Sequence, residues 1–237
     1  MDRFPTTRWT LVSAAADPGS PGSKAALEEL CIAYWYPVYA MIRGRGYTPE
    51  DASDLSQEYF IRILDGRLMR AADRGRGRFR SLLRKDCAYF LADHSDRLRS
   101  VKHGGGAAFL PIDDAERRFS QELSLDLDPE RLFDRAWAVS LLGRAFDRLE
   151  RQEVDAGRGD SFDRLKASLT EGMRSRPYAE LAAEAGTTVA AVQAAIVRLR
   201  RRYREALRSE VASTLASPTD AEIDEEIRTM LELLSSD

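Results

Sequence analysis

Apolar residues recur at three- and four-residue steps along most of this chain. This spacing places side chains on one face of an α-helix. Three such runs lie between residues 23 and 100: the first follows Ser23, the second opens at Thr48-Pro49, and the third starts at Phe79. Threonine is a favoured N-cap and proline suits the first helical turn, so the second helix has a well-defined start. The pattern predicts a compact unit of three helices.

Beyond this unit the helical period is interrupted. The triple glycine at residues 104–106 and Pro111 disfavour a regular helix, and acidic residues follow them. We interpret residues 101–129 as an acidic, glycine-containing linker. Helical periodicity then returns over residues 130–209 and continues in the acidic residues 210–237.

The sequence therefore predicts an all-α protein with two helical domains joined by a flexible linker. The predicted organisation, in chain order, is an N-terminal extension (1–22), a first helical domain (23–100), the linker (101–129), a second helical domain (130–209) and an acidic amphipathic tail (210–237). The tail either packs on the nearest helix, binds a partner, or masks a basic surface of the chain itself.

Charge is distributed in blocks, although the 237 residues sum to a net charge of −3. Arginine and lysine dominate residues 67–102 and 198–208, whereas aspartate and glutamate dominate residues 113–134 and 210–237. Basic patches bind polyanions because each cation placed at a phosphate releases condensed counterions. The basic blocks therefore indicate either nucleic-acid binding or solvated helix faces, which charge runs often are.

The residue types needed for catalysis or metal binding are scarce. The two cysteines lie far apart and lack partners at metal-ligand spacing, which argues against a disulfide scaffold or a zinc site. The chain has only two histidines, which argues against a His-rich metal centre and gives little support to a His-based triad. No run approaches the roughly 20 apolar residues of a membrane span, and the first residues lack the pattern of a secretory signal. We expect a cytoplasmic protein that is not an enzyme, has no catalytic residues, and needs no metal, cofactor or membrane.

A helix-turn-helix pattern stands out in the second domain. A short amphipathic segment from Tyr178 meets Gly186, and a longer one follows Thr188, a plausible N-cap. Small residues at the start of the second helix let its backbone approach a DNA groove closely. Gln193 can contact adenine there, and arginines further along can bind phosphates or guanine. The alternative is a helical hairpin of purely structural use.

Two helices of the first domain carry further candidates. Asp51, Asp54 and Glu58 share one side of the second helix, where they suit acid–base chemistry, a docking face for a basic partner, or plain solvation. In the third helix, basic residues alternate with aromatic residues. This combination can bind single-stranded nucleic acid, because the rings stack on unpaired nucleobases and the cations contact phosphates. Packing in the core is the other explanation of these aromatic residues.

Three segments resemble a known family. Residues 49–64 (PEDASDLSQEYFIRIL), residues 77–94 (GRFRSLLRKDCAYFLADH) and the helix-turn-helix of residues 178–207 resemble, in this order, segments of bacterial extracytoplasmic-function sigma factors. The resemblance covers about residues 24–208. The Thr7-Arg8-Trp9 opening and the insertion at residues 156–159 resemble a lineage of long chains, often encoded near Ser/Thr kinases.

The resemblance implies a role for each segment. Core RNA polymerase would be the partner through its β′ and β subunits, and docking on the coiled coil of β′ would involve Asp51, Asp54, Leu55, Gln57 and Glu58. Capture of the promoter −10 element as a single strand would involve Arg78, Arg80, Arg84, Lys85, Tyr89, Arg97 and Arg99. Recognition of the −35 element would involve Thr187, Thr188, Ala190, Ala191, Gln193, Ala194, Val197, Arg198, Arg201 and Arg202.

The resemblance predicts a transcription initiation factor whose partners are core RNA polymerase and promoter DNA, with an anti-sigma factor or a Ser/Thr kinase as further candidates. Two other interpretations stay open. One is a helix-turn-helix regulator that binds DNA without polymerase. The other is a degenerate sigma-like adaptor that binds polymerase or a signalling partner through its acidic tail.

Overall fold

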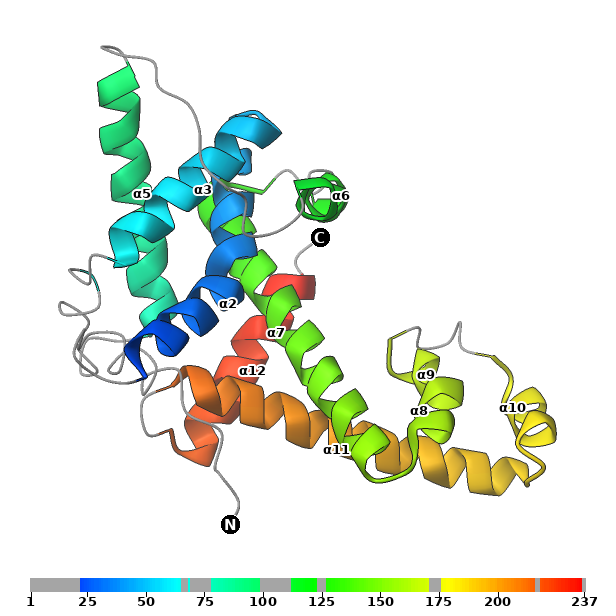
Figure 1. The fold of residues 1–237 in the computed structure, drawn as a ribbon. Coiled ribbons are helices and arrows are strands. Elements are labelled where there is room, and N and C mark those ends of the chain that lie inside the picture. The colour runs from blue at the N-terminus through cyan, green and yellow to red at the C-terminus, as the bar shows by residue number, and fades with distance from the viewer. Residues whose placement is uncertain are drawn as a thin grey trace. The chain divides into compact units, whose positions relative to one another are not determined.

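The computed structural model describes residues 22–64, 68, 78–98, 112–122, 127–170, 176–215 and 218–235. Within these ranges the regular secondary structure is helical and no strand occurs, so the predicted all-α class is confirmed for them (Figure 1). Two compact units divide the chain: unit 1 holds residues 1–140 and 211–237, and unit 2 holds residues 141–210. None of the described helices is both long enough and apolar enough to cross a membrane.

Each unit is built from helices of modest length. Unit 1 contains α2 (Ser23–Gly44), α3 (Pro49–Leu64), α5 (Phe79–Leu98), α6 (Ile112–Glu122) and α12 (Asp220–Ser235). Unit 2 contains α8 (Gly159–Leu165), α9 (Ala167–Thr170) and α10 (Tyr178–Glu184). The long helices α7 (Pro129–Asp155) and α11 (Val189–Thr214) contribute residues to both units.

Helix α2 forms the centre of unit 1. Its residues from Ala33 to Ile42 are all buried, as expected of a helix that is apolar on every side. Helices α3, α5 and α6 pack against it (Figure 1). An edge-on contact between the aromatic rings of Tyr34 and Phe79 joins α2 to α5. A hydrogen bond of 3.0 Å from the Tyr59 hydroxyl to the Leu83 carbonyl links α3 to α5.

Helix α6 lies inside the range that the sequence predicts as linker. Ala115 and Phe119 are its buried residues, and they lie on the side that faces α2. The helix is short and otherwise mostly charged, so its periodicity is weak and its stability depends on the surface it covers. The parts of the predicted linker outside residues 112–122 and 127–129, and the predicted extension before Gly22, lie outside the described residues.

Unit 2 holds the predicted helix-turn-helix. Phe162, Leu165, Leu181, Val192 and Ile196 are buried and supply apolar side chains from α8, α10 and α11 to its core. The structural boundaries of the unit, at residues 141 and 210, differ from the predicted range 130–209 chiefly at the start, because the first half of α7 belongs to unit 1.

Candidate nucleic-acid and protein interfaces

The turn between α10 and α11 has the geometry of a helix-turn-helix. Gly186 adopts a φ of 60°, in the left-handed region that glycine tolerates best. The amide of Thr187 donates to the carbonyl of Ala182 at 2.9 Å, which closes the end of α10. The amide of Ala191 donates to Thr188 Oγ1 at 3.2 Å, so the predicted N-cap of α11 is confirmed.

The outward face of α11 carries nearly all the residues predicted to contact the −35 element. The exposed members of this set are Thr187, Thr188, Ala190, Ala191, Gln193, Ala194, Val197, Arg198 and Arg201. Val197 is a large apolar residue that is 65% exposed, so core packing does not account for its presence here. Val189 shares the apolar spacing of Val192 and Ile196, which predicts a core position, but it is 41% exposed in the first turn of α11. The result is a helix face of small and apolar side chains that leads into arginines.

Arg202 is the exception within that set. Its Nη1 lies 3.0 Å from each carboxylate oxygen of Glu153, which is 3% exposed. Arg158 binds the same carboxylate, at 2.7 Å through Nε. Hydrogen bonds from Arg158, and then the charge of Arg202, lower the pKa of Glu153. Arg202 therefore neutralises a buried acid inside unit 2, a role that its place in an arginine run does not reveal.

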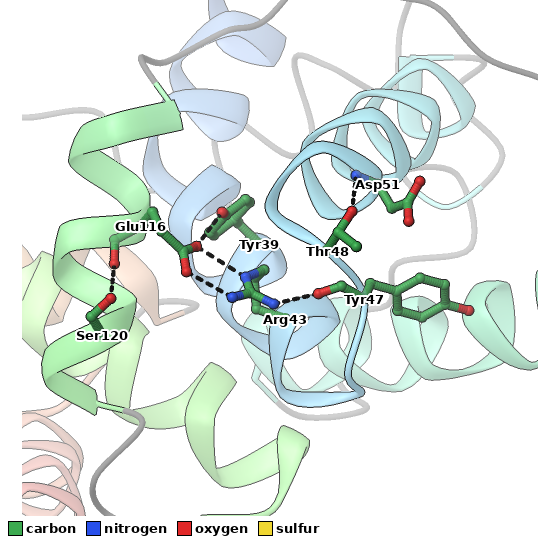
Figure 2. Close-up of polar contacts among 7 residues, drawn as sticks. All are labelled: Tyr39, Arg43, Tyr47, Thr48, Asp51, Glu116 and Ser120. Atoms are coloured by element: carbon green, nitrogen blue, oxygen red, sulfur yellow. Dashed lines mark hydrogen bonds and ion pairs between the residues drawn. The ribbon is translucent and has the colours of Figure 1, made fainter.

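The acidic stripe of α3 is partly as predicted. Asp51, Asp54 and Glu58 are exposed, and Ile61, with 62% exposure, continues the same face by one further helical step. The amide of Asp51 donates to Thr48 Oγ1 at 3.1 Å, which confirms the predicted cap of this helix (Figure 2). The stripe thus combines negative charge with an apolar side chain, as protein-binding surfaces often do.

Leu55 and Gln57, the other two residues predicted to bind polymerase, are both buried. Each is 5% exposed, and the side-chain amide of Gln57 donates to Ser53 Oγ at 3.4 Å within α3. They lie on the side of the helix that packs inside unit 1. They can therefore affect the binding of a partner only indirectly, by fixing the position of α3. Ile61 is an exposed residue that the motif comparison did not select, and its spacing of three residues from Glu58 is the signal that identifies it.

Helix α5 presents only part of the predicted basic and aromatic surface. Lys85 and Tyr89 are exposed, with the ammonium 6.0 Å from the ring centroid and Tyr89 63% exposed. Arg84 is half-buried and contacts the carboxylate of Asp134 on α7. The side chain of Arg97, and Arg99 as a whole, lie outside the described residues.

Arg78 and Arg80, predicted to contact DNA, both bind an acid of α12. Arg80 is 7% exposed, its guanidinium lies 4.2 Å above the ring of Trp137, and burial lowers its pKa. Its Nη1 lies 3.1 Å from one oxygen of Glu226, and Arg78 Nε lies 2.9 Å from the other. With 7% exposure, Arg80 is out of reach of an external ligand in this conformation.

A polar cluster that the sequence does not indicate fastens α6 to α2. Glu116 accepts hydrogen bonds from the Tyr39 hydroxyl at 2.7 Å, from Arg43 Nε at 2.9 Å and from Arg43 Nη2 at 2.7 Å (Figure 2). Arg43 also donates to the carbonyl of Tyr47, in the turn before α3. The bonds from Arg43 lower the pKa of Glu116, whereas burial and the bond to Glu116 raise the pKa of Tyr39.

The described residues include no group of three or more His, Cys, Asp or Glu side chains that is placed to hold a metal ion. Both cysteines are buried, and burial raises their pKa values, to about 11 for Cys31 and about 12 for Cys87. Thiols of this kind are poor nucleophiles at neutral pH.

Comparison of the chain with protein-family models, with curated proteins and with solved structures finds no match.

Proposed function

We propose that this chain is a transcription initiation factor of the extracytoplasmic-function sigma type. In this proposal α3 binds core RNA polymerase, α5 binds the −10 element, and the helix-turn-helix of unit 2 binds the −35 element. The observation that carries the proposal is the capped start of α11. It presents small side chains, Gln193 and two exposed arginines on one face, directly after a glycine turn.

The face of α11 suits the major groove of DNA. Ala190, Ala191 and Ala194 allow the helix to approach base edges closely, and Val197 can contact a thymine methyl group. Arg198 and Arg201 lie further along the helix, where guanidinium groups can bind the phosphates that flank the groove. The contacts to bases supply sequence preference, and the contacts to phosphates supply most of the affinity.

Unit 1 supplies the features that a simple DNA-binding domain does not need. The acidic stripe of α3 suits a basic partner surface, and the Lys85–Tyr89 pair suits an unstacked base beside a phosphate. The chemistry of RNA synthesis would belong to the polymerase, so the chain itself would require neither a cofactor nor a catalytic group.

A helix-turn-helix regulator that acts without polymerase is the second candidate. The observation that favours it is the engagement of Arg78, Arg80 and Arg84 in ion pairs within unit 1, which leaves less basic surface on α5 for single-stranded DNA.

The two functions differ in their dependence on core polymerase. Co-purification with bacterial core polymerase, followed by run-off transcription from genomic fragments, separates them: association with new start sites supports the sigma factor, and DNA binding without association supports the regulator.

Asp54→Arg tests the docking surface. A reversed charge at the centre of the α3 stripe should weaken association with core polymerase by about 10- to 100-fold, because like charges across an interface cost several kcal/mol. DNA binding by unit 2 should be unchanged. Asp147→Arg, at an exposed aspartate of α7 in unit 2, is the matched control. Equal polymerase association of the two variants would contradict the role of α3.

The double variant Arg198→Ala/Arg201→Ala tests the face of α11. Duplex promoter binding should fall about tenfold or more, and the slope of log affinity against log salt should become shallower by about 1.8 if both arginines contact phosphates. Polymerase association should persist. The control is Arg131→Ala/Arg151→Ala, which removes two exposed arginines of α7. Equal loss in both double variants would indicate a general charge effect instead of a specific surface.

A further inference from the structure

The acidic C-terminal helix α12 places a buried carboxylate on the basic start of α5. Glu226 is 1% exposed, and its two oxygens lie 2.9 Å from Arg78 Nε and 3.1 Å from Arg80 Nη1. All three residues belong to unit 1. The contact therefore joins the acidic tail to two of the arginines that the proposed function assigns to nucleic acid.

Further contacts hold α12 in this position. Ile223 and Met230 are buried on the same helix as Glu226. At the far end, Arg135 Nη1 donates to the carbonyls of Leu233 and Leu234 at 3.3 and 3.2 Å, which satisfies acceptors that a helix end leaves open. Ile227, Leu233 and Leu234 are half-buried on the same helix, so apolar side chains contribute to holding α12 in place together with Glu226 and Arg135.

The arrangement around Glu226 is that of an anion site. Guanidinium groups bind carboxylates and phosphates with the same geometry, one oxygen to each N–H group. A buried carboxylate costs several kcal/mol unless cations compensate it, so its retention here depends on Arg78 and Arg80. If the carboxylate leaves, Arg80 retains the charge of Asp134 and the ring of Trp137, and a phosphate group can take the place of the carboxylate beside Arg78 and Arg80.

The exposed side chains of α5 continue from this site. Residues 78, 85 and 89 are separated by seven and four positions, which places them on one side of the helix and its approach. Lys85 and Tyr89 are exposed there. A single strand that stacks a base on Tyr89 and passes Lys85 would bring its next phosphates toward Arg78.

We propose that Arg78 and Arg80 form a phosphate site for single-stranded nucleic acid, and that Glu226 of α12 occupies it as an internal competitor. The structure is then the masked state of unit 1, and displacement of α12 is a step in binding the strand. This inference rests on the proposed function for its ligand, and goes beyond it by assigning the acidic tail an inhibitory role at a defined site.

The test uses fluorescence anisotropy to measure the affinity of the full chain and of its α12 variants for a fluorescein-labelled oligothymidylate of about 20 nucleotides. Glu226→Gln should bind about 5- to 10-fold more tightly than the wild-type chain. Its salt slope should steepen by up to about 1.4, the value for two additional phosphate contacts on a single strand. Glu225→Gln is the matched control, because it removes the same charge one residue away, at an exposed position that binds Arg228 on α12 itself. The affinity of this control variant for the oligonucleotide should stay within about twofold of the wild-type affinity.

A second full-chain variant separates unmasking from a change in net charge. Met230→Asp places a charge at a fully buried position of α12, one helical turn from Glu226, and should detach the helix. Affinity for the oligonucleotide should rise although the variant is more acidic. Adding Arg78→Ala to Glu226→Gln should abolish most of the increase in affinity that Glu226→Gln produces alone.

Equal affinity of the wild-type chain, Glu226→Gln and Met230→Asp would overturn the inference, and would make the ion pairs purely structural. If polymerase association is intact in that case, the proposed function survives and only the masking role fails. Absence of oligonucleotide binding in every variant, together with absence of polymerase association, would overturn both proposals.

Discussion

Arginine has two distinct roles among the described residues, and the burial of the carboxylate that it pairs with decides between them. Arg198 and Arg201 are exposed on α11, whereas Arg202, next in sequence, neutralises Glu153. In unit 1, Arg80 lies between Trp137 and Glu226. Substitution of an arginine that compensates a buried acid should reduce stability first, because the acid is left without its counter-charge.

Glu116 provides a test of this reasoning through pH. Its pKa is lowered in the folded chain, chiefly by hydrogen bonds from Arg43. The stabilisation is therefore complete above the unfolded pKa of a glutamate, about 4.3, and is lost as the pH falls through the lower folded value. Glu116→Gln should reduce the free energy of unfolding by about 1–3 kcal/mol at pH 7. Urea unfolding should show this difference shrinking below about pH 4; a constant difference down to pH 3 would contradict the ionic role of Glu116.

At the scale of elements, local signals fix the ends of helices, whereas packing determines whether marginal helices form. Thr48 and Thr188 cap α3 and α11 as their sequences predict. Helix α12 begins with a capping box, in which the Thr219 amide donates to Glu222 at 2.7 Å and the Glu222 amide donates to Thr219 Oγ1 at 3.3 Å. Helix α6 has weaker local signals and depends on the surface of α2.

Two glycines of unit 2 should respond to alanine in opposite directions. Gly186 has a φ of 60° and an added Cβ meets no atom within 4 Å, so Gly186→Ala should cost about 1–2 kcal/mol through backbone strain alone. Gly143 lies inside α7 with equally open surroundings, so Gly143→Ala should stabilise by about 0.5–1 kcal/mol. Thermal unfolding of both variants measures whether each substitution stabilises or destabilises the chain. Destabilisation by both would contradict this expectation of opposite effects.

At the scale of the whole molecule, unit 1 has the larger buried core and contains both cysteines. Cys31 and Cys87 are 3% and 0% exposed, on α2 and α5. The thiols therefore report on this core without any added probe, and their reactivity measures how tightly α2 and α5 stay packed in the folded chain.

Both thiols should resist a thiol reagent at pH 8 in the native chain. Burial raises the pKa of Cys31 from 9.0 to about 11, which reduces its thiolate fraction about 100-fold, and Cys87 is shifted further, to about 12. Because pKa values above the working pH favour the unreactive thiol, labelling should become rapid only when guanidinium unfolds the core. Mass spectrometry after a short pulse of reagent measures the labelling, and fast modification of either cysteine in the native chain would contradict this core.

The sequence by itself determined the class of the fold, the starts of α3 and α11, the glycine turn and the outward face of α11, because helical period, caps and left-handed glycines are encoded within a few residues. Only the tertiary structure decided which members of those patterns are accessible. Leu55 and Gln57 are buried by the packing of α3, Arg202 is bound by Glu153, and Arg80 is covered by Glu226. In the arginine cases the partner lies many residues away in the chain. Burial and ion pairing depend on such distant neighbours, so no local pattern of residues specifies them.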